Sequence, residues 1–344
     1  MKIAQVAPLL GSIPPKGYGG IERTIANVTE ELVRRGHDVT LFATADSHSS
    51  ARLVPCAPAP VQADSMDQWV GFHLLMLERV YQDVEEFDVI HCHLEYFAGP
   101  LARRHPIPTV IDLHNPIGPT DEIIWREYAE IPVIADSEAH RAPAPWMNWQ
   151  GVVYPGLPGD LYRLQEQPEG YLAFLGRLSP EKGLPVAVQI AEQTGMPLKV
   201  AGNRPMFYDE YFTSQIEPLL AHPLVEYIGE VNDQQKQVLL GGASALLFPI
   251  QWNEPFGLVM IEALACGTPV IATSRGAVPE VIRDGQNGFV VDSVEAAAAA
   301  VARLSELSRQ ACRRDFEERF TVSRMVDQYV AIYERLAQTS QPGR

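Results

Sequence analysis

Short apolar runs alternate along the first half of the chain with stretches in which apolar residues recur every three or four positions. The runs predict parallel strands buried on both faces, and the periodic stretches predict amphipathic helices. Ile21, Ile25 and Val28 share one such helical face, and Gly36 is expected to end that helix. The strands expected in this half are residues 3–7, 39–43, 88–93, 109–114 and 133–137.

The pattern changes at residues 151–170, which are rich in turn-forming residues and are interpreted as the linker between two domains. The alternation of strands and helices then restarts and continues almost to the end of the chain. The strands expected here are residues 171–175, 198–201, 225–228, 245–249, 269–272 and 288–291, and the helices include residues 185–194, 209–221, 233–240, 294–307 and 322–336.

This order of elements predicts an α/β protein with two Rossmann-like, doubly wound domains. The expected domains are residues 1–155 and residues 156–321, and residues 322–344 are expected to form a helix that returns to the first domain, followed by a tail. Ligands of doubly wound sheets bind at the carboxyl ends of the strands. If those ends face each other, the site is expected in a cleft between the domains.

Composition narrows the possible partners. The 344 residues carry a formal net charge of −16, which argues against nucleic acid or an anionic membrane as the main partner, because both select basic surfaces. The four cysteines form no closely spaced pair, which is typical of a reducing compartment. No signal-peptide pattern opens the chain, and no apolar run approaches the length of a membrane span. We therefore expect a cytoplasmic protein.

The strongest indication of chemistry lies in residues 253–267 (NEPFGLVMIEALACG). Glu262 is the only charged residue between Glu254 and Arg275, in a helix expected to open at Gly257. A carboxylate in an apolar helix is costly unless it is hydrogen-bonded, and a helix N-terminus offers free N–H groups to an anion. Two carboxylates beside an anion site suit a phosphorylated ligand with hydroxyl groups, such as a nucleotide-sugar. The alternative is a core helix with one solvated Glu on its edge.

A second segment, residues 176–183 (GRLSPEKG), follows an expected strand and carries two cations. The guanidinium of Arg177 suits bidentate contact with phosphate oxygens, and Lys182 adds a point charge beside it. The alternative is a solvated loop that happens to contain an Arg and a Lys.

Other chemistries find less support. Two histidines that flank one residue share a face of a strand, as His91 and His93 do, and His114 ends another expected strand. No third ligand follows at a clear spacing and the chain has no Asp-x-Asp pair, so we expect no metal and no cofactor. The first strand is not followed by Gly-x-Gly-x-x-Gly, and no loop ends in Gly-Lys-Ser/Thr, which argues against nicotinamide oxidoreductases and P-loop enzymes.

Taken together, these motifs resemble glycosyltransferase family 4, whose members are retaining enzymes with the GT-B fold. In the second half the resemblance is carried by residues 176–183, by Glu254 and Glu262 with seven residues between them, and by residues 266–272 (CGTPVIA) and 279–289 (PEVIRDGQNGF). In the first half, residues 18–23 (YGGIER), 88–93 (DVIHCH), 112–115 (DLHN) and 135–141 (ADSEAHR) agree with it. The family usually has Asn-Gly-Val in the linker, where this chain has residues 154–157 (YPGL). This departure concerns the geometry of the linker and not the chemistry.

The resemblance implies a role for each matching residue of the second half. Arg177 and Lys182 would hold the donor diphosphate. Glu254 would contact the sugar, and Glu262 would contact the ribose hydroxyls. Further donor contacts would come from the backbone of Phe256, Gly257 and Leu258 and, at the nucleobase, from Val231 and Asp233.

In the first half, the resemblance places His114 near the junction of sugar and acceptor, with His93 a weaker candidate. Gly19 and Gly20 would allow phosphate or acceptor to approach the backbone, because glycine admits a ligand where any Cβ would clash. The expected catalytic residues are Glu254, His114, Arg177 and Lys182.

The predicted function is that of a retaining hexosyltransferase in carbohydrate biosynthesis. It would move a sugar from a UDP- or GDP-sugar to the hydroxyl of a soluble sugar or small molecule, with no metal ion and with attack from the face that the diphosphate leaves. Neither nucleic acid nor a membrane is an expected partner. Two alternatives remain open: a GT-B-fold sugar-nucleotide epimerase or phosphorylase, and a non-catalytic protein that binds nucleotide-sugars.

Overall fold

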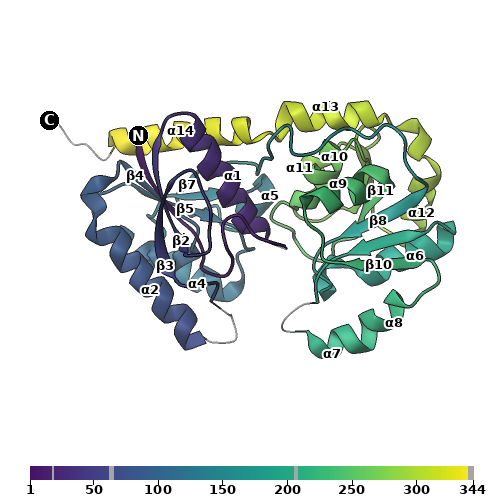
Figure 1. Ribbon diagram of the computed structural model, residues 1–344, viewed down its shortest axis with the longest axis horizontal. Helices are drawn as coiled ribbons and strands as arrows, with labels where there is room; N and C mark the ends of the chain where they lie inside the picture. The colour runs from purple at the N-terminus through teal and green to yellow at the C-terminus, as the bar shows by residue number, and fades with distance from the viewer. Residues whose placement is uncertain (18, 62–65, 205–207, 340–344) are drawn as a thin grey trace. The chain divides into compact units, whose positions relative to one another are not determined.

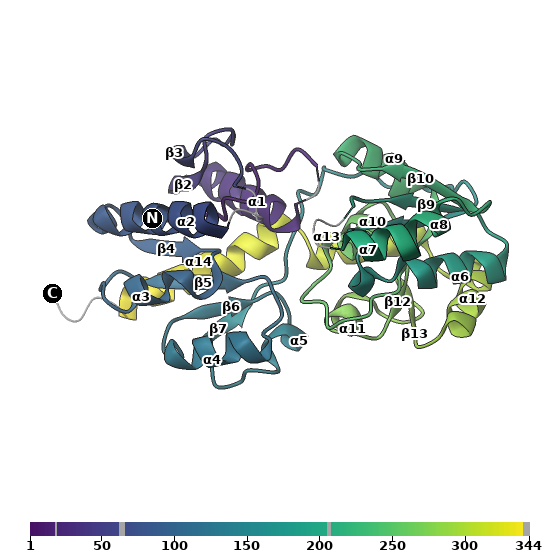
Figure 2. The ribbon, with the colours of Figure 1, turned by 90° about the horizontal axis from the view of Figure 1, so that it is seen from below.

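The computed structural model describes residues 1–17, 19–61, 66–204 and 208–339. The chain divides into two compact units, of which the first contains Met1–Gly156 and Val322–Arg344 and the second contains Leu157–Thr321. Each unit is a parallel sheet with helices on both faces (Figures 1 and 2). The predicted fold class, an α/β protein with two Rossmann-like doubly wound domains, is confirmed.

The first unit contains a seven-stranded parallel sheet with the order β3-β2-β1-β4-β5-β6-β7. The order reverses between β1 and β4, so the loops that follow these two strands lie at a topological switch point. The elements are β1 Lys2–Val6, α1 Gly20–Arg34, β2 Asp38–Thr44, β3 Arg52–Ala57, α2 Met66–Gln82, β4 Val89–Cys92, α3 Gly99–Ala102, β5 Thr109–Leu113, α4 Pro119–Glu127, β6 Val133–Ala135, α5 Glu138–Arg141, β7 Trp149–Val152 and, from the end of the chain, α14 Val322–Thr339.

Alternate residues of these strands serve the two faces of the sheet. Ile3 packs in a cluster with Val28 of α1 and Tyr329 of α14, and these two helices lie against each other. Its neighbour Ala4 belongs to a separate cluster that includes Met76 of α2. The near-continuous apolar pattern of the strands therefore follows from burial on both sides.

The second unit contains a six-stranded parallel sheet with the order β10-β9-β8-β11-β12-β13. Here the order reverses between β8 and β11, which places a second switch point at their carboxyl ends. The elements are β8 Tyr171–Leu175, α6 Leu184–Thr194, β9 Leu198–Ala201, α7 Asp209–Tyr211, α8 Glu217–Leu220, β10 Val225–Gly229, α9 Asp233–Gly242, β11 Ala243–Phe248, α10 Leu258–Ala265, β12 Val270–Thr273, α11 Val278–Val281, β13 Gly288–Val291, α12 Val294–Ala302 and α13 Arg309–Arg319.

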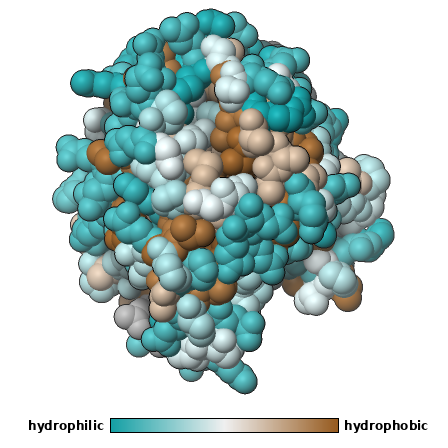
Figure 3. Space-filling model, turned by 90° about the vertical axis from the view of Figure 1, so that its right-hand side faces the viewer, coloured by the Kyte–Doolittle hydropathy of each residue, from teal (hydrophilic) through white to brown (hydrophobic). Residues whose placement is uncertain are grey.

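Helices of the second unit form two groups. Helix α6 packs against α12, whereas α10 packs against both α9 and α13 (Figure 1). The face of the molecule drawn in Figure 3 is largely hydrophilic, and its apolar side chains form separate patches. Among the residues that the structure describes, none of the helices is both long enough and apolar enough to cross a membrane.

The sequence-based prediction lacks several elements, among them β3, β7, α2 and α13, and each of these four has a weak apolar pattern. Strands β3 and β7 are the edges of the first sheet, where half-exposed residues blur the pattern, and β3 also contains Pro55. Helix α2 exposes Leu74 and Leu75, and α13 buries little besides Cys312 and Phe316. The interpretation of residues 151–170 as linker is wrong at its start, because β7 extends to Val152.

Candidate active site

The loops that follow β8 and β11 are joined to each other at the switch point of the second unit. The N–H of Gln251 donates to the carbonyl of Glu181 at 2.8 Å. Gly183 has a φ of 76°, and a Cβ at this position would lie 2.1 Å from the carbonyl oxygen of Pro249. Glycine is therefore required for this approach. The contact brings Lys182, the residue before this glycine, to the loop after β11.

Lys182 and Glu254 form a buried ion pair between these two loops. The Lys182 Nζ donates to Oε2 of Glu254 at 2.6 Å, and the two side chains are only 12% and 11% exposed. The indole Nε1 of Trp252 donates to the same oxygen at 2.6 Å, and the Lys182 ammonium lies 5.2 Å from the centroid of the Trp252 ring. The structure thus brings together two of the predicted residues and adds Trp252, which the sequence does not reveal because a tryptophan in a loop carries no specific signal.

Arg177 lies in the same loop but has a different partner. Its Nη2 donates to Oε1 of Glu181 at 2.6 Å and its Nε to the Ser179 hydroxyl at 3.1 Å. The side chain is 38% exposed, more than that of Lys182. A ligand phosphate would therefore compete with Glu181 for this guanidinium.

Glu262 is buried one turn inside α10. The helix begins after Gly257, whose φ is 86°, and Glu262 is 3% exposed. Its Oε1 accepts a hydrogen bond from Lys236 Nζ at 2.6 Å and lies 3.4 Å from the hydroxyl of Tyr162. The alternative of a solvated glutamate on a core helix is wrong, and the expected compensation for burial comes from Lys236 and Tyr162, neither of which was predicted.

The N-terminus of α9 sets the position of Lys236. Asn232 caps this helix by accepting the N–H of Gln235 at 3.0 Å, and the Gln235 side chain accepts the N–H of Asn232 at 2.9 Å. This reciprocal capping box fixes the first turn. Asp233 and Lys236, three residues apart, share one face of the helix. The Tyr162 hydroxyl lies 3.2 Å from Asp233 Oδ1 and 3.4 Å from Glu262 Oε1, so its single proton is shared between two carboxylates.

The other predicted donor contacts have side chains that serve packing. The ring of Phe256 is 3% exposed and packs edge-on against Phe320, with 5.9 Å between the ring centroids. Val231 is buried, and Leu258 is the first residue of α10. A Cβ at Gly257 would lie 3.0 Å from the Phe248 ring. Contacts of Phe256, Val231 and Gly257 with a ligand would therefore be made by the backbone, whereas Leu258 is only partly buried.

The glycines predicted in the first unit lie at the start of α1, of which Gly20 is the first residue. A Cβ at Gly19 would lie 2.7 Å from Cβ of Pro15 and 2.9 Å from Oε2 of Glu22. The chain's own packing thus accounts for a glycine here. Tyr18, the first residue of the matching motif, lies outside the described residues.

A cluster of polar side chains follows the ends of β4, β5 and β6 in the first unit. The Nε2–H of His93 donates to Oε1 of Gln5 at 3.0 Å, so the Nδ1 of His93 accepts. The Nε2–H of His114 donates to this Nδ1 at 2.9 Å, and the Nδ1 of His114 lies 3.4 Å from Oδ2 of Asp136. This assignment of protons follows from the network, and it makes His114 a donor at both ring nitrogens. His114 is therefore an imidazolium.

Electrostatics of the cluster agree with that assignment. Burial alone would lower the pKa of His114, but the carboxylates of Asp136 and Asp112 outweigh it and raise this pKa to about 9. Burial, together with the nearby charges of His91 and His114, lowers the pKa of His93 well below its usual value. One histidine of the cluster is thus charged, and its neighbour is neutral.

The same cluster contains residues with the chemistry of metal ligands. Asp112 supplies a third ligand that spacing along the sequence does not reveal, because it comes from the neighbouring strand. The hydroxyl of Tyr333 lies 2.7 Å from His91 Nδ1, and the hydroxyl of Tyr329 donates to Asp112 Oδ2. Hydrogen bonds within the protein thus connect these side chains, and we assign no metal to the cluster. Among the residues that the structure describes, two groups have ligand atoms within 4.8 Å of one another: His91, His93 and Asp112, and Asp112, His114 and Asp136.

We expect His114 to titrate near pH 9 in the folded protein and the variant Asp136→Asn to lower that pKa. Because the folded pKa lies above the unfolded value of about 6.5, the resulting stability is complete below about pH 6.5 and is lost as the pH rises through 9. Two-dimensional NMR of ¹⁵N-histidine-labelled protein measures the titration. A His114 resonance that loses its proton below pH 6.5 would contradict the imidazolium assignment.

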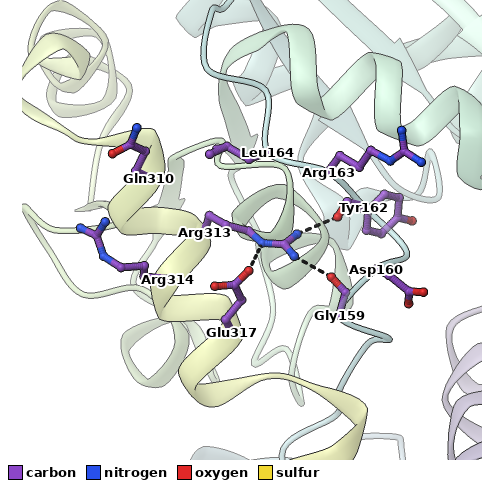
Figure 4. A pocket seen from close by; sticks show the side chains of 9 residues that line it. All are labelled: Gly159, Asp160, Tyr162, Arg163, Leu164, Gln310, Arg313, Arg314 and Glu317. Atoms are coloured by element: carbon purple, nitrogen blue, oxygen red, sulfur yellow. Dashed lines mark hydrogen bonds and ion pairs between the residues drawn. The ribbon is translucent and has the colours of Figure 1, made fainter.

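A hollow of about 710 Å³ lies between α13 and the segment that opens the second unit (Figure 4), and no predicted site residue lines it. Its centre is Arg313. The guanidinium donates to the carbonyls of Tyr162 and Ala265 at 2.7 Å, to that of Gly159 at 2.6 Å, and to the carboxylate of Glu317 at 2.6 Å. Arg313 therefore ties the segment that carries Tyr162 to the end of α10.

Replacement of Arg313 by methionine is expected to lower the free energy of unfolding by about 2–4 kcal/mol, because several charge-assisted hydrogen bonds are lost at once. Urea denaturation followed by circular dichroism measures the change. Arg314→Met is the matched control, since Arg314 is the next residue of the same helix and is exposed. Equal stabilities of the two variants would show that the bonds of Arg313 contribute nothing.

Comparison with known proteins places the whole chain among sugar transferases. A family described as Glycosyltransferase Family 4 matches residues 18–150, and one described as Glycosyl transferases group 1 matches residues 163–320. The chain is 25% identical to phosphatidyl-myo-inositol mannosyltransferase of Mycobacterium leprae (strain TN), with 98% of this chain and 97% of that protein aligned.

Two solved structures resemble this one over its full length. AviGT4, a glycosyltransferase involved in Avilamycin A biosynthesis, is 26% identical with a TM-score of 0.74, and 98% of each chain is covered. Alr3699/HepE of Anabaena, in complex with UDP and glucose, is 20% identical with a TM-score of 0.76, covering 97% of this chain and 100% of that one.

Proposed function

The chain belongs to the glycosyltransferases of family 4, with the GT-B fold, and from this premise we propose its donor, mechanism and acceptor. The proposed reaction transfers a hexose from a UDP- or GDP-sugar to an acceptor hydroxyl with retention of configuration at the sugar. The proposed acceptor is a soluble sugar or small molecule in the cytoplasm.

One observation carries the proposal: the carboxyl ends of β8 and β11 gather two buried lysine–carboxylate pairs beside the N-terminus of α10. The pairs are Lys182–Glu254 and Lys236–Glu262, each at 2.6 Å. The free N–H groups of a helix N-terminus and an adjacent lysine suit a diphosphate, and buried carboxylates suit the hydroxyls of ribose and sugar. The Anabaena relative, which was crystallised with UDP and with UDP-glucose, supports a nucleotide-sugar donor.

In the proposed mechanism the diphosphate leaves onto Lys182, Arg177 and the N-terminus of α10, which offset its developing charge. The acceptor oxygen attacks from the same face and passes its proton to the leaving phosphate oxygen. His114 would act as a fixed cation and not as a base, because both of its ring nitrogens already donate. Glu254 contacts the sugar, where bonding changes.

The test is a thermal-shift screen of UDP- and GDP-sugars, followed by an assay for free nucleoside diphosphate with and without acceptor. Release that depends on acceptor indicates transfer, and NMR of the product's anomeric proton reports retention. A donor epimerised without acceptor, or consumed only with inorganic phosphate, would favour an epimerase or a phosphorylase. Binding without turnover of any donor would favour a binding protein.

Metal independence is a separate prediction. Since cationic side chains and a helix N-terminus offset the diphosphate charge, dialysis against EDTA is expected to leave the rate of transfer within about twofold. The rate is measured before and after dialysis, and again after addition of Mg²⁺ or Mn²⁺. A loss of activity that either ion restores would overturn this part of the mechanism.

A further inference from the structure

Resting on the proposed donor site, we propose that Trp252 and Tyr162 are positioning residues for the two site carboxylates. Each directs a polar hydrogen at the oxygen that also accepts a lysine, with Tyr162 sharing its single hydroxyl proton with Asp233, so that the other carboxylate oxygen faces the nucleotide-sugar. Trp252 does this for Glu254 on the sugar side, and Tyr162 does it for Glu262 on the ribose side. The donor's two polyhydroxyl groups would each meet a carboxylate held in one orientation.

At Glu254 the evidence is the sharing of a single oxygen. Oε2 accepts both the Lys182 ammonium and the Trp252 indole N–H, each at 2.6 Å. Within the parts of the chain that the structure describes, Oε1 forms no hydrogen bond. A lysine has three donors on a flexible stem and does not define the plane of a carboxylate, whereas an indole has one N–H in a fixed direction. The indole N–H of Trp252 therefore sets the orientation of the Glu254 carboxylate.

Glu262 repeats this arrangement with different residues. Its Oε1 accepts the Lys236 ammonium at 2.6 Å and faces the Tyr162 hydroxyl at 3.4 Å, while Oε2 forms no hydrogen bond to the described residues. The Tyr162 hydroxyl is itself held by Asp233 at 3.2 Å. Because Arg313 binds the backbone carbonyl of Tyr162, the phenol is fixed at both ends.

The two positions lead to different kinetic consequences. Ribose is bound alike in donor and in free nucleoside diphosphate, so loss of Tyr162's hydroxyl should weaken both. Bonding at the sugar changes only during transfer, so loss of Trp252's N–H should act on turnover. A residue that merely supported the fold would lower stability without separating these two quantities.

The experiment compares Trp252→Phe with Tyr162→Phe, since each change removes the hydrogen-bond donor of the side chain and keeps an aromatic ring. Calorimetry with UDP, or with GDP if the protein prefers it, measures affinity, and donor turnover gives kcat. We expect Tyr162→Phe to weaken nucleotide binding by about three- to tenfold, as for one ordinary hydrogen bond, because the Tyr162 proton is shared with Asp233. We expect Trp252→Phe to lower kcat by at least about tenfold with the nucleotide affinity changed less than about twofold.

Tyr171→Phe is the matched control. The Tyr171 hydroxyl is also bonded inside the second unit, to the carbonyls of Val238 and Leu239 at 3.2 and 2.9 Å, but touches neither carboxylate. It should reduce thermal stability and leave affinity and kcat unchanged. The inference is overturned if the wild type binds nucleotide while both test variants behave like this control, or if both lose affinity and kcat in the same proportion. A wild type that binds neither UDP nor GDP overturns the proposed function itself, and the inference with it.

Discussion

Replacing Lys182 by methionine is expected to lower kcat/KM for glycosyl transfer by about two to three orders of magnitude, the usual cost of removing one preorganised partner of a developing negative charge. Lys182 lies in the loop between β8 and α6, is almost buried, and has the carboxylate of Glu254 as its partner at 2.6 Å. The variant loses the cation that would receive the leaving diphosphate. It also leaves Glu254 buried with Trp252 as its remaining donor.

A matched lysine makes this test specific. Lys199 belongs to β9 of the same unit, where its ammonium lies 3.9 Å from a carboxylate oxygen of Glu226 and 4.1 Å from the centroid of the Tyr171 ring. Lys199→Met should leave kcat/KM unchanged. Because removal of one partner of a buried pair also destabilises the fold, the unfolding of Lys182→Met is measured in parallel. If Lys182→Met stays folded and retains activity within threefold of the wild type, Lys182 does not bind the leaving group.

Much of the fold follows from periodicity, and the exceptions lie where packing is one-sided. Central strands such as β8 and β12 are buried on both faces, so their residues are apolar almost without interruption. The edge strand β7 is half-buried along its whole length, and a short half-buried segment beside prolines cannot be distinguished from a linker by pattern alone. The helix α13 is held by the many bonds of Arg313, which hydrophobic periodicity does not register.

In the candidate site, too, some residues can be predicted from the sequence and others cannot. Lys182 and Glu254 are predictable because motifs mark them, and the fold brings them into contact across 72 residues of sequence. The partners of Glu262 are not predictable, because Lys236 and Tyr162 are 26 and 100 residues away and neither belongs to a motif. Burial of a carboxylate implies that some donor compensates it, but only the three-dimensional structure shows which.

Replacing each of the two site carboxylates by glutamine should change a different quantity, UDP affinity for Glu262 and kcat for Glu254. Glu262→Gln is expected to weaken UDP and the donor alike, by about 1.5–3 kcal/mol, since a charge-assisted hydrogen bond to the ribose is lost. Glu254→Gln is expected to lower kcat about a hundredfold with UDP affinity almost intact, because it removes an interaction that matters where bonding changes.

Calorimetry of UDP binding beside steady-state kinetics measures both quantities, with Glu295→Gln, an exposed residue at the start of α12, as the control. The lysine pairs add a further expectation. Glu262→Gln leaves Lys236, whose side chain is only 12% exposed, with a neutral partner, so this variant should also lose stability. The double variant Lys236→Met, Glu262→Gln should recover part of that loss. Equal losses of UDP affinity in the two single variants would show that the ribose and sugar roles are not divided between these carboxylates.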